Sequence, residues 1–532
     1  MNDHYDVTVI GYGPAGVTAA NLLGRLGLRV LVLERDPDVY ARARAISTDE
    51  EVIRIWQRVG LAGKVTADML AGLPLTFVDA AGRTFLHFTP ESFGNGYAPQ
   101  WFIYQPALER ILRAGVERYP NVDVRLGHEC TGLDQDDDRA VVTFRAVSGG
   151  ADQRASSAYV IAADGGSSPT RSRLDVGFEG RTYEDRWVVI DTRVVREWPE
   201  IGRLRFHCDP ERPAVDCPTP LGHHRWEFPV LPGDDEAALT STEGAYRLLG
   251  RHGIGREQVE VLRAVVYSHH VRFAARWRVG RVFLAGDAAH VMPPWIGEGM
   301  ASGVRDVENL CWKLATVLTG DWPATVAEEL LGSYESERMP HVRAVTRAAV
   351  NVGRLITERR RHVTAVRDPL VRTVMRLPGV GPYLTRGGWF PVTRFTTGFL
   401  SGTGARRVIG AHVPQPWVLG EDGIRTRLDD ALGHLGWAVL RIGPDPGPVQ
   451  SSWVQAGVRV LRLRAAGSDP GPGALVDIDN VLVDWAFERK VTALVLRPDA
   501  IVYAAVTGGR ELPPPPASTI PALIPANKVR PA

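Results

Sequence analysis

The chain has 532 residues, which is enough for about three domains, and 44% of them are hydrophobic while 23% are charged. Its 62 basic and 61 acidic residues nearly cancel and form no basic patch, so charge gives no argument for nucleic-acid or membrane binding. We see no signal-peptide pattern, no apolar run long enough for a membrane span, and no C-x-x-C among the four cysteines. We therefore expect a cytoplasmic protein without a metal site.

Residues 5–34 predict a strand, a helix and a second strand, with glycines at the first turn. In this context the G-x-G-x-x-G spacing of Gly11, Gly13 and Gly16 indicates a dinucleotide site. The reason is that a helix N-terminus offers free N–H groups to a pyrophosphate. Glu34 ends the second strand, where a carboxylate can bind the adenosine ribose. The alternative is a turn that is merely rich in glycine.

Two later strands also end in acidic turns. Asp164 follows an apolar strand, and Gly286 and Asp287 follow the apolar run at 282–285. A loop rich in Pro and Gly comes next, and a helix is predicted to begin near Ala301. We expect Asp287 to hydrogen-bond a polyol chain and the helix start to face an anionic group. Each of these dipeptides alone is a common turn signal.

The rest of the chain predicts several further units. Short β-rich runs separated by turns indicate a mainly antiparallel layer inserted into the first domain, and a helical stretch follows at about 325–362. Strands and helices alternate again beyond a Gly- and Pro-rich boundary at 397–416. The expected division is a discontinuous dinucleotide-binding domain (1–74, 97–180 and 276–370), a substrate-binding β layer (75–96 and 181–275), a helical connection (371–400), a C-terminal α/β domain (401–510) and a Pro-rich disordered tail (511–532).

The three glycine- and acid-containing segments, in this order, resemble the single-component FAD-dependent aromatic hydroxylases, which include 4-hydroxybenzoate, phenol and polyketide hydroxylases. The resemblance covers about residues 1–370. The segments "HVMPPWIGEGM" and "QPALE" are most similar to the 3-(3-hydroxyphenyl)propionate hydroxylase branch. The C-terminal part more weakly resembles the thioredoxin-like appendage of the phenol and polyketide hydroxylases. It has no C-x-x-C, so no thiol redox role follows.

The resemblance implies an α/β fold, with a Rossmann-type FAD-binding domain, an inserted antiparallel β substrate domain and a thioredoxin-like C-terminal domain. The residues that it implies for binding FAD are Gly11, Gly13, Pro14, Ala15, Gly16, Glu34, Arg35, Arg44, Gln105, Asp164, Gly286, Asp287, Pro294, Gly299, Met300 and Ala301. Two departures stand out. Ala301 replaces an Asn of several relatives, and Glu298 replaces the usual Gln of the branch, which would add a negative charge near the flavin.

Only one dinucleotide fingerprint is present, so FAD would fill it and NADPH or NADH would bind transiently as co-substrate. In the resembled family NAD(P)H reduces the flavin, O2 adds to form a C4a-hydroperoxide, and an electron-rich aromatic ring receives one oxygen atom. The implied substrate is phenolic or of polyketide type, for example a compound like 3-(3-hydroxyphenyl)propionate. A homodimer is also expected.

Few side chains would need to act on the substrate. We expect the loop around Pro293 and Gly297 to wall the pocket and to aim backbone N–H groups at the flavin. Arg225 could pair with a substrate carboxylate, while Trp226 and Phe228 alternate with it and suit the core or the pocket wall. The candidates for a relay that takes the phenol proton are His224, Tyr267, His269 and His270. Each of these residues also suits a purely structural role.

Other functions stay open on this scaffold. A halogenase is disfavoured because its W-x-W-x-I-P segment is absent. A Baeyer–Villiger oxygenase, an epoxidase and a non-catalytic FAD-binding redox module remain alternatives, because fold and cofactor do not fix the reaction.

Overall fold

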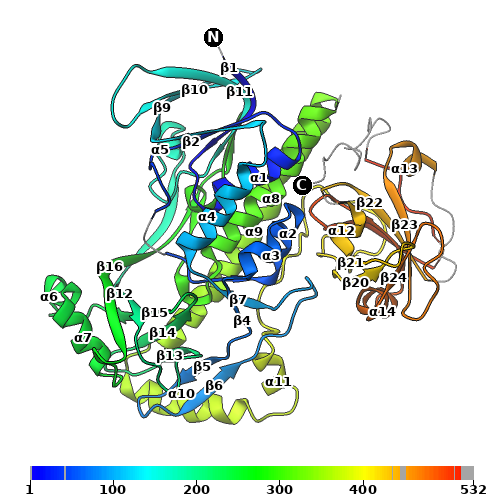
Figure 1. Cartoon of the computed structure of the whole chain (residues 1–532). Coiled ribbons are helices and arrows are strands. Elements are labelled where there is room, and N and C mark those ends of the chain that lie inside the picture. The colour runs from blue at the N-terminus through cyan, green and yellow to red at the C-terminus, as the bar shows by residue number, and fades with distance from the viewer. Residues whose placement is uncertain are drawn as a thin grey trace.

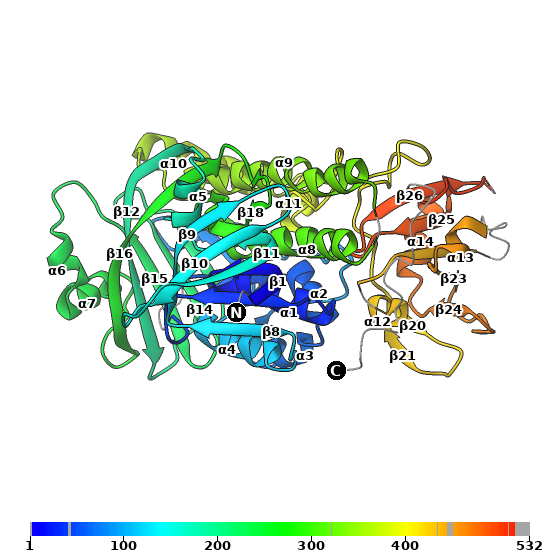
Figure 2. The ribbon, with the colours of Figure 1, turned by 90° about the horizontal axis from the view of Figure 1, so that it is seen from above.

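The computed structural model describes residues 3–40, 44–320, 322–433, 435–443, 451–508 and 510–516. Three lobes surround two long helices, α8 (Glu298–Thr319) and α9 (Ala324–Ile356). The N-terminal sheet lies at one end, the inserted sheet at the other, and the C-terminal lobe at one side (Figures 1 and 2). The expected tail at 511–532 is described only as far as residue 516, and residues 517–532 lie outside the described residues.

The N-terminal sheet brings together strands that are far apart in the sequence. Its order is β17 (Arg278–Val279), β18 (Val282–Leu284), β11 (Gln153–Ala162), β1 (Asp3–Ile10), β2 (Val30–Glu34) and β8 (Val122–Leu126), with β10 (Ala140–Ala146) and β9 (His128–Gln135) antiparallel beside β11. The pairs β18–β11, β11–β1, β1–β2 and β2–β8 are parallel. The carboxyl ends of β1, β11 and β18 therefore meet at one edge, where open α/β sheets bind ligands.

Helices cover this sheet, and its core is continuous from β1 to α9. The chain adds α1 (Pro14–Arg25), α2 (Glu50–Arg58), α3 (Ala62–Thr66), α4 (Gln105–Val116) and α5 (Pro169–Arg173), and a small sheet of β3 (Ser47–Asp49), β7 (Gln100–Phe102) and β4 (Leu70–Ala71). Helix α1 packs on α4 and α8. Asp49 caps α2, because its side chain accepts from the backbone N–H groups of Glu51 and Val52.

The second sheet is the inserted layer. Its order is β19 (His290–Val291), β16 (Val259–Ala274), β12 (Phe178–Val194), β15 (His223–Pro229), β14 (Ala214–Thr219), β13 (Leu204–His207), β5 (Leu75–Val78) and β6 (Thr84–Phe88). The pairs are antiparallel except β13–β5. Helices α6 (Glu236–Thr240) and α7 (Thr242–Gly250) pack against β16, and α10 (Arg361–Val374) and α11 (Val380–Thr385) against β6.

The C-terminal lobe has its own sheet and core. The sheet order is β21 (Arg425–Arg427), β20 (Trp417–Leu419), β24 (Ala474–Asp477), β23 (Arg459–Arg464), β22 (Ala438–Ile442), β25 (Val491–Leu496) and β26 (Val502–Thr507). Its helices are α12 (Leu428–Leu432), α13 (Ser451–Gln455) and α14 (Val481–Glu488). Strands β22 and β23 are parallel, while β25 and β26 add antiparallel on the other side, which is the thioredoxin-like order.

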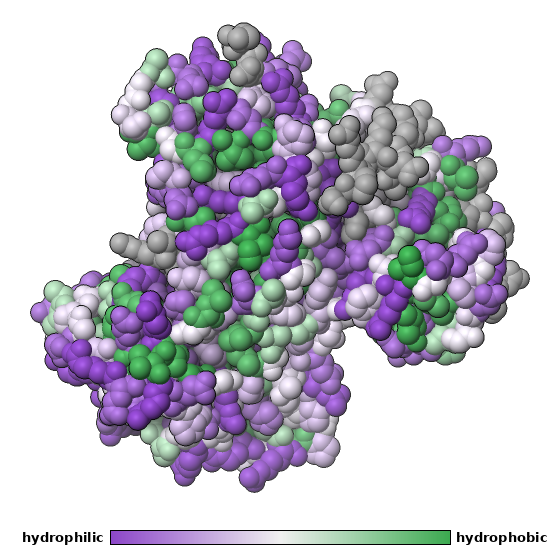
Figure 3. Space-filling model, in the orientation of Figure 1, coloured by the Kyte–Doolittle hydropathy of each residue, from purple (hydrophilic) through white to green (hydrophobic). Residues whose placement is uncertain are grey.

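The start of the expected tail packs onto this lobe. Leu512 is buried, and the Trp453 indole N–H donates to the Pro513 carbonyl at 2.9 Å. In Figure 3 the lobe lies beside the main body, and apolar residues are scattered over the face of the molecule that the figure shows. Within the described ranges, no helix is both long and apolar enough to cross a membrane. The prediction of an α/β fold with an inserted β layer is confirmed.

Candidate active site

A cavity of about 820 Å³ lies between the two large sheets and the C-terminal lobe. Three groups of segments line it: the carboxyl edge of the N-terminal sheet, one face of the inserted sheet, and the loop that leads into the C-terminal lobe. The expected site residues that line it are Gly13, Pro14, Ala15, Arg44, Gln105, Arg225, Tyr267, His269, Gly286, Asp287, Pro294, Gly297, Gly299 and Met300.

The glycines of the first turn have two different roles: two of them allow close backbone packing, and one borders open space. A Cβ on Gly11 would lie 2.4 Å from the Ala163 carbonyl oxygen, and one on Gly16 would lie 2.0 Å from the Gly11 carbonyl oxygen. A Cβ on Gly13 would meet nothing within 4 Å, and Gly13 borders the cavity. The turn therefore leaves open space at the N-terminus of α1, as a bound pyrophosphate requires.

The acidic residues around this turn lie outside the cavity lining. Glu34 accepts from the backbone N–H groups of Tyr12 at 2.7 Å and Asp36 at 2.9 Å, and so fixes the turn. Arg35 is solvent-exposed beside Asp36. Asp164 accepts from the Ser168 hydroxyl and from the Thr170 N–H at 3.0 Å, at the start of α5.

The segment after β18 is held by a buried network that the sequence did not suggest. Asp306 of α8 accepts from the Gly286 N–H at 3.0 Å, lies 2.7 Å from the His290 ring, and pairs with Arg338 at 2.9 Å. These contacts place Asp287 at the cavity wall, where the residue is exposed to the open cavity. Desolvation by the protein around the cavity raises the pKa of Asp287.

Helix α8 begins at Glu298, three residues before the predicted start near Ala301. Gly297 takes a left-handed conformation with φ of 72° and turns the chain into the helix. Gly299 and Met300 line the cavity, whereas Ala301 is fully buried behind them. Pro294 also lines the cavity, but its neighbour Pro293 does not.

Gln105 positions the chain around Arg44. Its side-chain oxygen accepts from the backbone N–H groups of Arg44 at 2.8 Å and Ala45 at 2.7 Å. Arg44 lines the cavity between Tyr40, on which its guanidinium stacks, and the inserted sheet.

Strand β15 presents alternate residues to its two faces. Arg225 and Glu227 line the cavity, and Arg225 pairs with Asp191 at 2.8 Å. His224, Trp226 and Phe228 point to the other face, where Trp226 and Phe228 pack with the residues of α7. The structure therefore does not bring His224 to the cavity, and it lies 3.7 Å from Asp216 instead.

Strand β16 supplies the other relay candidates. His269 and Tyr267 line the cavity with ring centroids 5.6 Å apart, and the neighbouring His270 does not line it. The His269 ring stacks on Trp187 and meets the Trp295 ring edge-on at 5.1 Å. Burial lowers the pKa of His269 to about 4 and raises the pKa of Tyr267. Both side chains are therefore neutral near neutral pH.

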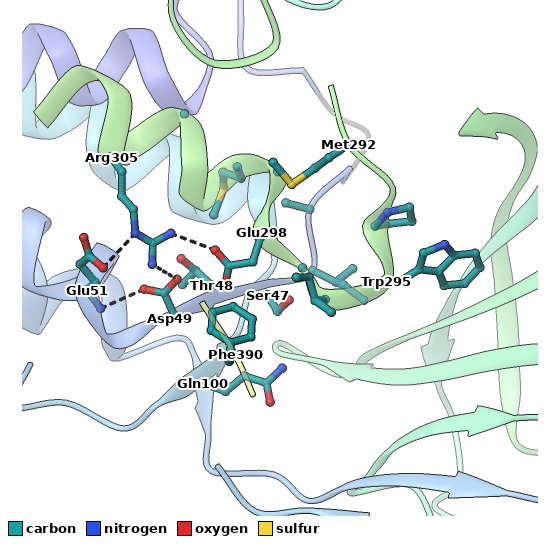
Figure 4. Close-up of a pocket in the computed structure, with 18 of the residues that line it drawn as sticks. Ser47, Thr48, Asp49, Glu51, Gln100, Met292, Trp295, Glu298, Arg305 and Phe390 are labelled. Atoms are coloured by element: carbon teal, nitrogen blue, oxygen red, sulfur yellow. Dashed lines mark hydrogen bonds and ion pairs between the residues drawn. The ribbon is translucent and has the colours of Figure 1, made fainter. Parts of the chain in front are cut away.

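A buried charged cluster at the start of α8 was also missed by the sequence analysis. Figure 4 shows Arg305 reaching toward Asp49, Glu51 and Glu298. Its Nε lies 3.0 Å from Glu51, and its Nη1 lies 2.9 Å from Glu298. The sequence signals were the charge of Glu298 and the helix-capping pattern at Asp49, and neither identifies Asp49 and Arg305, 256 residues apart, as partners.

These features fit FAD. The open space at Gly13, the free start of α1, the polar Asp287 wall and the backbone at Gly297–Met300 lie along one cavity. A dinucleotide needs such a phosphate cradle and such polyol partners.

Comparison with known proteins supports the same cofactor. Residues 4–349 match the family model described as FAD binding domain, and residues 410–513 match the HcaD C-terminal domain. A 3-(3-hydroxy-phenyl)propionate/3-hydroxycinnamic acid hydroxylase of Burkholderia cenocepacia is 35% identical, with 94% of this chain and 93% of the relative covered. The enzyme of that name from Comamonas testosteroni is 32% identical, with 94% of each covered.

Solved structures agree with this assignment. A ternary complex of aklavinone-11 hydroxylase with FAD and aklavinone is 26% identical, with a TM-score of 0.75 and 96% of this chain and 97% of that chain covered. The anhydrotetracycline hydroxylase of Streptomyces rimosus is 26% identical, with a TM-score of 0.74 and 95% and 96% covered. The predicted family and cofactor are confirmed: the chain belongs to the FAD-dependent aromatic hydroxylases, flavoprotein monooxygenases built on an FAD binding domain.

Proposed function

We propose that this enzyme uses NAD(P)H and O2 to hydroxylate a phenolic acid with a short side chain, of the 3-(3-hydroxyphenyl)propionate type. One observation carries the proposal: neutral His269 and Tyr267 stand in an aromatic wall of the same cavity that contains the glycine turn. The names of the relatives support this substrate class.

The residues that would hold FAD follow from the cavity. The pyrophosphate would lie in the space at Gly13, at the N-terminus of α1. Arg44 would neutralise its negative charge, and Asp287 would accept hydrogen bonds from the ribityl hydroxyl groups. The backbone at Gly297–Met300 would face the flavin ring, and the helix start favours negative charge there. The chemistry that bound FAD supplies is to accept a hydride from NAD(P)H and to activate O2.

The inserted sheet would hold and activate the aromatic ring. Phe77, Phe206 and Trp295 line the cavity, so a planar apolar ring can be packed and water excluded. The imidazole of His269 has no hydrogen-bond partner within the described parts of the chain, and its neutral ring nitrogen can accept a hydrogen bond from the phenol hydroxyl. The lowered pKa makes His269 a weak base, so it shares the phenol proton as the ring reacts instead of removing it beforehand. A phenolate is more electron-rich than a phenol, which favours attack by an electrophilic oxygen.

Two arginines supply positive charge to the same wall. Arg225 and Arg263 both line the cavity, and Asp191 lies between them at 2.8 Å from the Nε of Arg225 and 2.9 Å from the Nε of Arg263. Asp191 thereby fixes both guanidinium planes. We infer that they attract the carboxylate of the substrate side chain.

The test is a substrate panel on the purified yellow protein. NADH and NADPH oxidation is measured with 3-(3-hydroxyphenyl)propionate, its ester, and phenols without a carboxylate, under labelled O2. The acid should accelerate NAD(P)H oxidation and gain one labelled oxygen atom on the ring, while the ester reacts poorly. If every phenol leaves the oxidation rate unchanged and only peroxide forms, a Baeyer–Villiger or epoxidation reaction takes precedence.

Location and assembly are part of the proposal. All four cysteines are unpaired, which suits a cytoplasmic protein. A homodimer is also proposed, and light scattering at several protein concentrations tests it.

A further inference from the structure

The cluster around Arg305 contains more acid than base. Asp49, Glu51 and Glu298 all contact its guanidinium, and all four residues line the cavity. With every group ionised the cluster would carry two net negative charges in a buried site. Such a charge is costly at low dielectric, so the cluster has reason to retain a proton.

Among the residues that the structure describes, Arg305 is the charged partner of Glu51 and Glu298. His341 and His412 face Glu51 from α9 and from the loop before β20, and burial lowers the pKa of each to about 3, so both are neutral. Arg338, which also faces this region, is paired with Asp306.

The hydrogen bonds indicate which carboxyl group keeps the proton. Asp49 accepts two backbone N–H groups at the start of α2, and both oxygens of Glu51 accept from the Thr393 hydroxyl. Glu298 has Arg305 as its donor and otherwise lies against the Asp49 carboxylate. Burial, and then the charge of Asp49, raises the pKa of Glu298 to about 8.

Glu298 also lies within the backbone segment Gly297–Met300, which is proposed to face the flavin ring. It is the first residue of α8, between Gly297 and Gly299, and its side chain points toward the cavity beside Ser47 and Asp49 (Figure 4). We propose that Glu298 holds a proton in its contact with Asp49 and that this proton is coupled to the reduction of FAD. The inference rests on the proposed placement of FAD along Gly297–Met300.

The coupling follows from charge. Hydride transfer from NAD(P)H brings two electrons and one proton to FAD, which leaves one negative charge on the reduced cofactor. That charge makes loss of the Glu298 proton harder, and by reciprocity loss of the proton makes reduction harder. Replacing Glu298 by Gln removes the carboxyl group that holds this proton, so the coupling between proton loss and FAD reduction should disappear.

The first measurement is the midpoint potential of the bound FAD against pH in the wild type, in Glu298→Gln and in Glu257→Gln. Glu257 is an exposed partner of Arg196 far from the cavity lining and serves as the matched control. The wild type and Glu257→Gln should show an additional fall in potential that begins near pH 8, and Glu298→Gln should lack it. Parallel curves for all three proteins would overturn the proposal.

The second measurement needs neither FAD nor substrate, so it holds even where Glu298→Gln binds FAD poorly. The infrared difference spectrum between the wild-type and Glu298→Gln apoproteins in heavy water near neutral pH should contain a protonated-carboxyl band, because buried Glu308, whose pKa is also raised to about 8, contributes equally to both. Absence of a band from this difference spectrum would refute the retained proton. Neither experiment contains a phenol, so failure of the proposed hydroxylation would leave both results intact.

Discussion

Single side chains at the glycine turn have separable tasks, and this leads to a paired prediction. Gly13 has φ of −71°, which any residue adopts, and open space beside it, so Gly13→Val should fold but purify colourless because the side chain occupies the pyrophosphate space. Gly16→Val should instead fail to fold, because its Cβ would overlap the Gly11 carbonyl. Flavin absorbance per protein and circular dichroism check both. A yellow Gly13→Val protein would contradict the proposed pyrophosphate position.

Asp287 yields a prediction of measurable size. Its carboxylate at the cavity wall would accept ribityl hydroxyl hydrogen bonds, so Asp287→Ala should weaken FAD binding by about 1–3 kcal/mol. Fluorescence titration of the apoprotein with FAD measures this loss. An unchanged dissociation constant would remove Asp287 from the cofactor site.

The residues that the sequence analysis identified are those with a local signature. Gly13 and Asp287 follow strands within short recognisable segments, and both line the cavity. Arg305 has no such signature, because its partners Asp49 and Glu51 lie on other elements and only the tertiary fold brings them to α8. The same holds for Asp306, whose partner Gly286 is 20 residues away.

In the inserted sheet, the packing of a whole strand decides which of its alternating side chains reach the cavity. The alternation of β15 was visible in the sequence, but which face met the cavity was not, because that depends on how the sheet packs on α7 and on the N-terminal lobe. The sequence therefore offers no reason to prefer His269 over His224 as a relay candidate, whereas in the fold His269 lines the cavity and His224 does not.

The alternation of β16 provides a matched pair of variants. His269 lines the cavity and the adjacent His270 does not. As a proton acceptor, His269 should matter to the reaction, so His269→Gln should lower the rate of hydroxylation by about a hundredfold to ten-thousandfold. His270→Gln should change it little. Product formation at saturating phenol, with FAD content as the folding control, measures both, and equal losses would exclude His269 as the base.

The molecule as a whole is held together by buried charges between its lobes. Helix α2 contacts the C-terminal lobe through Arg54 and Arg58, which both pair with Asp429 of α12. Helix α9 does the same through Glu337, which pairs with Arg497 at 2.7 Å. The sequence predicted a separate thioredoxin-like unit, but its docking could not be predicted, since isolated charges in a sequence do not identify their partners.

This docking should make the C-terminal lobe necessary for the stability of the whole chain. Asp429 receives two hydrogen bonds from Arg54 and one from Arg58. Asp429→Ala therefore removes this carboxylate from both buried guanidinium groups. Breaking a buried pair in this way should cost about 3–5 kcal/mol, whereas Glu257→Ala, at an exposed pair, should cost less than about 1 kcal/mol. Urea unfolding followed by intrinsic fluorescence measures the difference.

The pH dependence of that loss tests its electrostatic origin. Burial opposes ionisation of Asp429, but Arg54 and Arg58 outweigh it and lower its pKa well below the usual range. A depressed folded-state pKa stabilises the protein above the unfolded value of about 4 and ceases to do so as the pH falls through the folded value. The gap in stability between the wild type and Asp429→Ala should therefore stay constant from neutral pH down to about 4 and narrow at lower pH. A gap that is unchanged in acid would mean that Asp429 contributes packing rather than charge.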